Sequence, residues 1–236
     1  MRTARHLAIR RRWLVPVAVV MAAAAAATAW GWLVWLPNYR PELHERERYG
    51  IDVSHHQGRI EWDRVAHDGI AFAYIKATEG GDLVDSRFSE NWTNAKEAGL
   101  VRGAYHFFTL CTPGGQQARN FLRVVPDDPQ ALAPAVDLEL AANCRARPDK
   151  VAVERELRAF LALVDRATGH AAVLYVGDDF EARYRVRTQF GRSLWRRRFL
   201  RRPVVDDWAI WQVGGFAAVD GVRGRVDLDV FRQPDG

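Results

Sequence analysis

A regular alternation of strand-like and helix-like segments begins at Tyr49, and it constrains the fold more than any other feature of the sequence. Short apolar runs alternate with longer amphipathic segments, several of which end in glycine. Such an order predicts a parallel sheet whose strands are connected by helices, either as a closed barrel or as an open doubly wound sheet. We expect strands at residues 49–54, 71–80, 101–108, 132–140, 171–177, 208–213 and 225–231, and helices at 60–69, 86–99, 113–125 and 148–169.

The N-terminus has a different composition from the rest of the chain. Five arginines lie within the first 12 residues, and no charged residue then occurs until Arg40. About 20 apolar residues span a bilayer, and basic residues before such a span predict that the N-terminus is cytoplasmic. A cleaved signal peptide is the alternative, because Ala27-Thr28-Ala29 resembles a cleavage site and the remaining protein would then be secreted. We therefore expect a cytoplasmic basic tail (1–12), a transmembrane signal anchor (13–36), a linker (37–48) and a folded domain outside the cytoplasm (49–233).

The net charge of +5 belongs to that tail. Arg2, Arg5, Arg10, Arg11 and Arg12 account for it, and the rest of the chain holds 29 basic and 29 acidic residues. No basic segment interleaved with aromatics predicts a nucleic-acid partner. One stretch, 182–203, contains nine arginines and no acid. It is either a solvated helix face or a patch that docks on anionic lipids or wall polymers.

Two acids interrupt the apolar segment APAVDLEL at 133–140. Side chains alternate along a strand, so Asp137 and Glu139 share a face with Ala135, while Val136 and Leu138 share the other. Buried carboxylates are costly unless they are paired, solvated or used. In barrel enzymes the C-terminal ends of the strands carry the active site. We therefore interpret Asp137 and Glu139 as catalytic.

Further acids follow the same pattern. Asp52 alternates with Ile51 and Val53, and Asp227 and Asp229 alternate with apolar residues in the last expected strand. Several inward acids at strand ends predict an acidic pocket, which suits either metal binding or glycoside hydrolysis. The histidines and cysteines lack the spacing of common metal sites, so no metal is expected. Glycosidases use a pair of carboxyl groups, one as proton donor, and Asp137 with Glu139 supplies such a pair.

Seven motifs resemble those of glycoside hydrolase family 25 lysozymes, which are N-acetylmuramidases that cleave peptidoglycan. In order they are GIDVSHHQG (50–58), AYIKATEG (73–80), GAYHFF (103–108), PAVDLEL (134–140), LYVG (174–177), WAIWQV (208–213) and GVRGRVDLDVF (221–231). The resemblance covers nearly all of 49–233. It implies a flattened (β/α) barrel of about eight strands with fewer helices toward the C-terminus. It implies no cofactor.

The resemblance also implies a role for each matching residue. Glu139 matches the general acid and Asp137 its partner, which would either orient the 2-acetamido group of the sugar or act directly. Asp52 and Asp227 match the other catalytic acids. The usual family pattern has Asn where Asp229 stands, so Asp227 is the preferred candidate. Tyr175 and Trp211 are alternatively core residues. The substrate-binding residues implied are Tyr105, Tyr175, Trp211, Gln212 and Glu79.

The expected partners are peptidoglycan glycan strands and, through the N-terminal helix, a membrane, with the protein a monomer. Two other functions stay open. A glycan-binding module without activity would lack the acids, all of which are present here. A hydrolase of another N-acetylated glycan, such as a chitinase-like barrel, would usually show a longer acidic motif before Glu139.

The only cysteines, Cys111 and Cys144, each follow an expected strand. The two strands are consecutive, so in a parallel barrel both cysteines lie at the same end, near Asp137 and Glu139. Neighbouring strands are about 5 Å apart, which permits a disulfide, and an extracytoplasmic domain meets oxidising conditions. We expect a bridge that fixes the rim of the pocket and stabilises the fold by about 3 kcal/mol. Two free thiols are the alternative.

Overall fold

The computed structural model describes residues 2–233, with side chains from residue 15 onward. It divides into two compact units, Met1–Arg40 and Pro41–Gly236. In the first unit, α1 (Arg2–Trp30) continues into a short π-helical turn, η1 (Gly31–Trp35). Within it, Val15–Trp35 is long and apolar enough to cross a membrane, with a mean hydropathy of 1.9. The expected N-terminal apolar helix is therefore confirmed.

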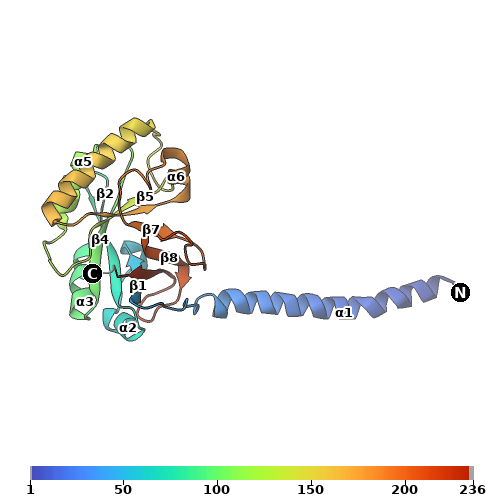
Figure 1. Ribbon diagram of the computed structural model, residues 1–236. Coiled ribbons are helices and arrows are strands. Elements are labelled where there is room, and N and C mark those ends of the chain that lie inside the picture. The colour runs from blue at the N-terminus through green and yellow to red at the C-terminus, as the bar shows by residue number, and fades with distance from the viewer. Residues whose placement is uncertain (1, 234–236) are drawn as a thin grey trace. The chain divides into compact units, whose positions relative to one another are not determined.

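The second unit is a closed barrel, as Figure 1 shows. Its strands follow the order β1-β9-β8-β7-β6-β5-β4-β2, and pairing between β1 and β2 closes the ring. This closure decides between the two predicted architectures. A short strand, β3, pairs with the outer part of β2. The strands are β1 (Glu47–Val53), β2 (Phe72–Glu79), β3 (Leu83–Val84), β4 (Val101–Phe107), β5 (Ala135–Leu138), β6 (Val173–Val176), β7 (Leu194–Arg197), β8 (Trp208–Ala217) and β9 (Val226–Arg232).

Most neighbouring strands of the barrel are parallel, and β9 is the exception. It runs antiparallel to both β8 and β1. Only residues 218–225 connect β8 to β9, which is too short for a helical crossover, so the chain must turn back on itself. The alternation predicted from sequence therefore ends here, and fewer helices occur toward the C-terminus, as expected.

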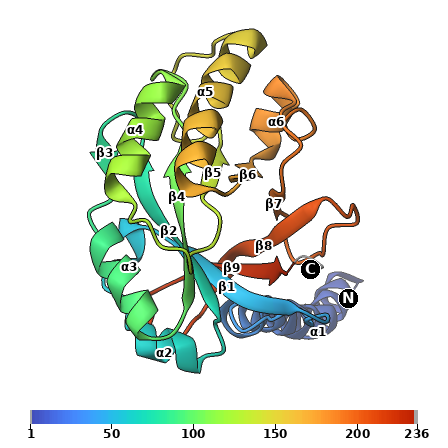
Figure 2. The same cartoon turned by 60° about the vertical axis from the view of Figure 1, so that its left-hand side comes forward.

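Helices cover one side of the barrel. They are α2 (Trp62–His67), α3 (Phe88–Glu97), α4 (Gly114–Val124), α5 (Lys150–Thr168) and α6 (Asp178–Tyr184), with a short 3-10 turn, η2 (His55–Gln57). Figure 2 shows α3, α4 and α5 along the side formed by β2 to β6. Each end of α5 has a clear cause. The Asp149 side chain accepts a hydrogen bond from the Ala152 amide, and Gly169 adopts the left-handed conformation that ends a helix.

Large side chains fill the interior of the barrel. The buried cluster consists of Phe72, Tyr74, Ala135, Val173, Tyr175, Trp195 and Ile210. The Tyr74 hydroxyl donates a hydrogen bond to the Ala133 carbonyl at 2.9 Å. Since the interior is closed by this packing, a substrate can reach the inward side chains only from the end at which the parallel strands terminate.

The folded unit begins before the predicted boundary at Tyr49. β1 starts at Glu47, whose carboxylate accepts a hydrogen bond from the His44 amide at 2.9 Å. The Tyr49 hydroxyl donates to the Pro41 carbonyl. Part of the expected linker therefore packs as an extension of the barrel. The sequence interpretation also missed three elements, which are β3, α6 and β7.

Candidate active site

A pocket of about 340 Å³ lies at the C-terminal ends of the parallel strands. Four of its lining residues are the acids predicted to be catalytic: Asp52, Asp137, Glu139 and Asp227. They come from β1, from β5 and the residue that follows it, and from β9. The other lining residues are Tyr105, Ala135, Tyr175, Trp195, Arg197, Gln212 and Gly215. The structure thus brings together acids that are up to 175 positions apart, from Asp52 to Asp227.

Asp137 is the penultimate residue of β5. Burial raises the pKa of its carboxyl well above the ordinary value, and the negative charge of Glu139 raises it further. Its Oδ1 atom is buried and has no hydrogen-bond partner among the described residues. A buried carboxyl oxygen without a partner is unusual. It is available to a donor that enters the pocket.

Glu139 follows β5, and the chain around it is held by the amide of Asn143. The Asn143 Nδ2 donates to the carbonyls of Glu139 and Phe108, both at 2.9 Å. Its Oδ1 accepts from the amides of Leu110 and Cys144, also at 2.9 Å. One side chain therefore joins the loop after β4 to the loop that carries Glu139. The sequence interpretation did not identify Asn143 as part of the site.

A hydrogen-bonded chain crosses the pocket from β6 to β1. The Tyr175 hydroxyl donates to Gln212 Oε1 at 3.1 Å, and Gln212 Nε2 donates to Asp52 Oδ2 at 2.8 Å. Burial raises the pKa of Asp52 well above its ordinary value, with the charge of Asp227 adding to the effect. The Gln212 hydrogen bond opposes this shift by stabilising the carboxylate. Tyr175 and Gln212 thus line the pocket, as expected from the resemblance.

Asp227 and Asp229 share a face of β9 but differ in their surroundings. Asp227 lines the pocket, next to Gly215, where a Cβ atom would lie 2.9 Å from the Asp227 carboxylate. Asp229 is fully buried, and its Oδ1 accepts a hydrogen bond from the indole of Trp195 at 2.9 Å. Burial raises the pKa of Asp229, and the nearby charge of Asp52 raises it further. The structure therefore supports the preference for Asp227 as the acid that faces the pocket.

Two predicted substrate-binding residues do not line the pocket. Trp211 is 1% exposed, and its indole donates to the Arg198 carbonyl at 2.8 Å. Since Gln212 faces the pocket, its neighbour in β8 must face the other side of the sheet. Trp211 is a core residue here, which corrects its expected place in the pocket wall. Glu79 instead accepts a hydrogen bond from Lys76 Nζ at 2.7 Å, at the end of β2.

Two pocket residues, Trp195 and Arg197, were not identified from the sequence. Both lie on β7, a strand of four residues that includes two adjacent arginines. Such a strand has no apolar run long enough to be recognised. The signal that could have found it is the pair Leu194 and Trp195, two apolar residues directly after the turn-forming Gly191 and Ser193.

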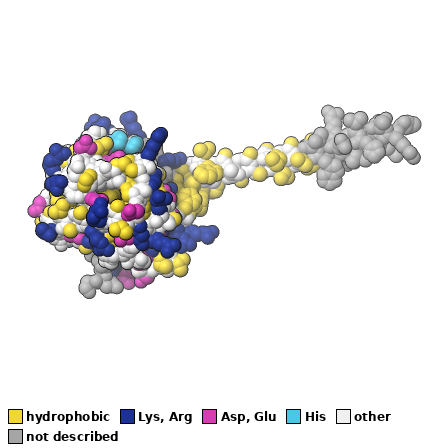
Figure 3. Space-filling view, turned by 90° about the horizontal axis from the view of Figure 1, so that it is seen from above, with side chains coloured by type: hydrophobic (Ala, Val, Ile, Leu, Met, Phe, Trp, Pro, Cys, Tyr) yellow, Lys and Arg dark blue, Asp and Glu magenta, His cyan; other side chains and the backbone are white. Residues whose placement is uncertain are grey.

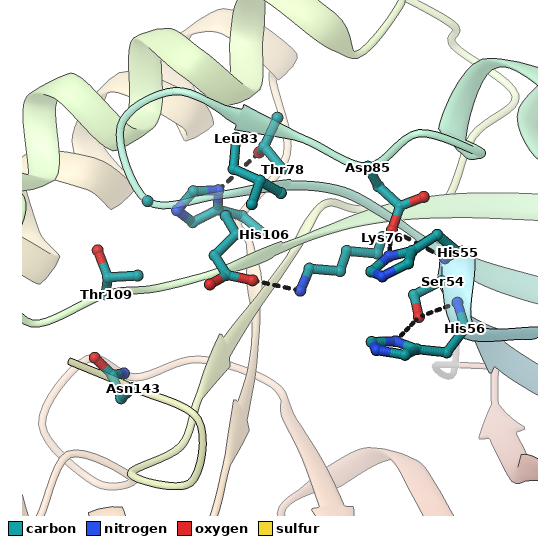
Figure 4. A network of polar contacts seen from close by, with 12 residues as sticks. Ser54, His55, His56, Lys76, Thr78, Leu83, Asp85, His106, Thr109 and Asn143 are labelled. Carbon is teal, nitrogen blue, oxygen red and sulfur yellow. Dashed lines mark hydrogen bonds and ion pairs between the residues drawn. The ribbon is translucent and has the colours of Figure 1, made fainter.

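The histidines near the site have structural partners. His106 is fully buried between Thr78 (2.7 Å) and Gln117 (3.0 Å), and burial lowers its pKa to about 4. His55 follows β1, and its ring and backbone amide contact the buried carboxylate of Asp85 (Figure 4). Within residues 2–233, no group of three or more His, Cys, Asp or Glu side chains is placed to hold a metal ion.

Cys111 and Cys144 form the expected disulfide, with their Cα atoms 6.2 Å apart. The bridge connects the loop after β4 to the loop after β5, next to Asn143. The rim beside Glu139 is therefore fixed twice, by a covalent bond and by the four hydrogen bonds of one amide.

Comparison with known proteins agrees with this geometry. The profile of glycosyl hydrolases family 25 matches residues 51–222, most of the chain. The chain belongs to this family. The family 25 glycosyl hydrolase from Bacillus anthracis is 32% identical and superposes with a TM-score of 0.73, over 84% of this chain and 94% of that one. The bacterial lysozyme from Streptomyces coelicolor is 31% identical, with a TM-score of 0.71 over 79% and 92% of the two chains.

Among sequences, the uncharacterized protein YegX of Escherichia coli K12 is 39% identical over 193 residues, which are 78% of this chain and 69% of YegX. Membership of family 25 and the likeness to lysozymes identify the chain as a lysozyme-like glycoside hydrolase. The expected family, its fold and its enzyme class are therefore confirmed.

Proposed function

We propose that this family 25 enzyme hydrolyses the β-1,4 bond between N-acetylmuramic acid and N-acetylglucosamine in peptidoglycan. The observation that carries the proposal is the pair formed by Asp137 and Glu139, in which Asp137 presents a buried oxygen without a hydrogen-bond partner. An acetamido N–H is a donor of the kind that this oxygen lacks. A carboxyl pair beside such an oxygen suits hydrolysis of an N-acetylated sugar.

In the proposed mechanism Glu139 is the general acid, and it protonates the glycosidic oxygen as the bond to the muramic acid unit breaks. Asp137 accepts a hydrogen bond from the 2-acetamido N–H, which orients the acetamido oxygen toward the anomeric carbon. That oxygen attacks as the leaving group departs, and water later opens the cyclic intermediate with retention of configuration. Direct attack by Asp137 is the alternative role.

The remaining pocket residues would bind and orient the sugar. Asp52 is held by Gln212, and Tyr175 is held at the other end of the same amide. Tyr105 provides an aromatic wall on β4. Asp227 would hold substrate hydroxyl groups opposite Glu139. Glu79 would act indirectly, since it pairs with Lys76, and Lys76 favours the ionised form of Asp137.

We further propose that the protein is a monomer anchored by its N-terminal helix, with the catalytic unit outside the cytoplasm, where peptidoglycan lies. The helix at Val15–Trp35 has the length and composition that this requires. A signal peptide cleaved near Ala29 would instead release the enzyme. There are two competing functions. The protein could hydrolyse a different N-acetylated glycan, or it could bind glycan without cleaving it.

Substitution of the carboxyl pair tests the function. Glu139→Gln should lower kcat on purified cell walls by about 10²–10⁴-fold, the usual size of a general-acid contribution. Asp137→Asn should also lower kcat, because an amide cannot orient the acetamido group as a carboxylate does. The control is Glu97→Gln, which makes the same change on the exposed end of α3. Near wild-type clearing of walls by Glu139→Gln would contradict the assignment.

A second substrate separates the two roles of Asp137. Glycan strands from which the acetyl groups have been removed lack the internal nucleophile, so substrate assistance predicts that they are not cleaved. Turnover of these strands, lost on Asp137→Asn, would instead assign direct attack to Asp137. Products identified by mass spectrometry, with muramic acid at the reducing end, would separate this activity from that of a hydrolase with another specificity.

A further inference from the structure

The arginine-rich stretch 182–203 is neither a single helix face nor a free basic patch. It runs from the end of α6 through a loop into β7 and the turn beyond it. Four of its arginines form close ion pairs: Arg187 with Asp178, Arg192 with Asp165, Arg196 with Asp207 and Arg202 with Glu47. Figure 3 shows basic and acidic side chains interspersed on the catalytic unit. These four arginines therefore serve the fold.

Arg197 differs from these arginines. It lies two residues after Trp195 on β7, so it shares the inward face of the barrel, and it lines the pocket. Its side chain is exposed, and it forms no close ion pair with any described carboxylate. Its guanidinium interacts with the Tyr175 hydroxyl and, at longer range, with Asp227 and Glu139. Arg197 is thus a cation placed at the mouth of an acidic pocket.

Burial is the main cause of the raised pKa values of the buried pocket acids, and Arg197 is a leading influence only on that of Asp227. Burial raises the pKa of Asp52 and that of Asp137. For Asp227, burial raises the pKa and Arg197 opposes this only in part. A guanidinium presents a planar fork of N–H donors that matches a carboxylate, and it keeps that capacity when no protein carboxylate occupies it.

Those of the four pocket acids that are ionised would repel an anionic ligand. Arg197 is the lining residue that offsets this repulsion, since it is the cation among those that line the described pocket. A neutral polymer of N-acetylglucosamine has no carboxylate that Arg197 could bind. Glycan that contains muramic acid carries carboxylates, either on the lactyl group of the sugar or on a peptide attached to that group.

We propose that Arg197 is a specificity-determining residue that binds a carboxylate carried by the muramic acid unit or its attached peptide. This inference rests on the proposed muramidase function and deepens it. Arg197 would favour acidic wall glycan over neutral N-acetylated glycan. In this proposal the pocket acids hydrolyse the glycosidic bond, whereas Arg197 determines which glycan is bound.

Binding is measured in the Glu139→Gln background, so that no substrate is consumed. Calorimetry compares wall fragments that keep their peptides, glycan strands stripped of peptides so that the lactyl carboxylate is free, and both materials after their carboxylates have been converted to methylamides. Adding Arg197→Gln should reduce the preference for charged over amidated ligand by about tenfold, the size of one charge-assisted hydrogen bond at a partly open site. The charged material that shows the larger loss identifies the source of the carboxylate.

Arg198→Gln is the matched control, because it removes the same charge from an exposed residue that directly follows β7 and does not line the pocket. Arg197→Lys should restore part of the preference, since it keeps the charge but not the fork. The inference is overturned if Arg197→Gln leaves the preference unchanged, or if Arg198→Gln reduces it equally. It is also overturned if charged and amidated ligands lose affinity to the same extent, since Arg197 would then act through the shape or charge of the pocket alone.

Failure of the proposed function gives a different result. If the enzyme is not a muramidase, the protein with Arg197 intact neither cleaves the wall glycan nor binds it in the Glu139→Gln form. If only the inference fails, cleavage and binding persist and the Arg197 substitution does not alter the choice between ligands.

Discussion

At the scale of single residues, two acids on the same face of one strand differ in their surroundings. Asp229 and Asp227 are two positions apart on one strand, yet only Asp227 reaches the pocket. Asp229 is fully buried against Trp195, and burial raises its pKa, with the charges of Asp52 and Asp227 adding to the shift. In its neutral form a carboxyl group has nearly the shape of an asparagine amide. Asp229 is thus close in shape to the Asn that the family pattern favours here.

Asp229→Asn should stabilise the protein increasingly as the pH rises. A carboxyl group whose pKa is higher in the folded state binds more protons when folded, so wild-type stability falls as the pH rises from about 4 through the folded pKa. The amide does not titrate, and it avoids this loss, by about 1.4 kcal/mol for each unit by which folding raises the pKa. Urea unfolding at pH 5 and pH 8 measures the effect. A wild-type advantage that grows with pH would contradict it.

At the scale of elements, the loops after β4 and β5 act as one unit. The disulfide between Cys111 and Cys144 joins them covalently, and Asn143 joins them by hydrogen bonds that include the Glu139 carbonyl. The bridge restricts the unfolded chain, whereas Asn143 fixes the backbone at Glu139, the proposed general acid. The two devices should therefore have separable effects on stability and on turnover.

Replacing both cysteines by alanine should lower the free energy of unfolding by about 3 kcal/mol while most of kcat remains, because Asn143 still holds the loop. Asn143→Ala removes the hydrogen-bond donor to the Glu139 carbonyl. For each kcal/mol of unfolding free energy lost, it should therefore lower kcat more than the double cysteine variant does. Denaturant titration and initial rates on wall fragments give both quantities for each variant. If the loss of kcat relative to the loss of unfolding free energy were the same in both variants, the disulfide and Asn143 would not have separate roles.

At the scale of the whole molecule, the chain consists of a barrel and a separate apolar helix. The barrel unit, Pro41–Gly236, has its own core and closes its own sheet through β1 and β2. The ion pair of Arg202 with Glu47 connects residues 155 positions apart within that unit. The lining residues of the pocket described above all belong to this unit.

A protein that starts at Pro41 should therefore fold and cleave soluble wall fragments with the same kcat/KM as the full chain. The full chain should fractionate with membranes, because the apolar stretch at Val15–Trp35 is long enough to span them. Fractionation followed by N-terminal sequencing tests the anchor. A mature chain that begins just after Ala29 and occurs in the soluble fraction would show that the helix is a cleaved signal.

The local periodicity of the sequence determined much of this protein. Alternation within strands predicted inward acids at Asp52, Asp137, Glu139, Asp227 and Asp229, and the family resemblance gave the preference for Asp227 over Asp229. The order of strands and helices predicted the parallel part of the barrel, and consecutive strands predicted the bridge between Cys111 and Cys144. These features depend on residues close together in the chain, and such residues are constrained by backbone geometry alone.

Only the tertiary structure decided which side chains reach the pocket. Trp211 and Gln212 are adjacent, so one of them had to face away, but the register of β8 against its neighbours decided which. Trp195 and Arg197 enter the site on a strand too short and too charged to be recognised by its periodicity. Which arginines of the stretch 182–203 form ion pairs depends on where distant carboxylates lie in the folded barrel. Contacts between distant residues exist only once the barrel has closed, and for that reason no local pattern encodes them.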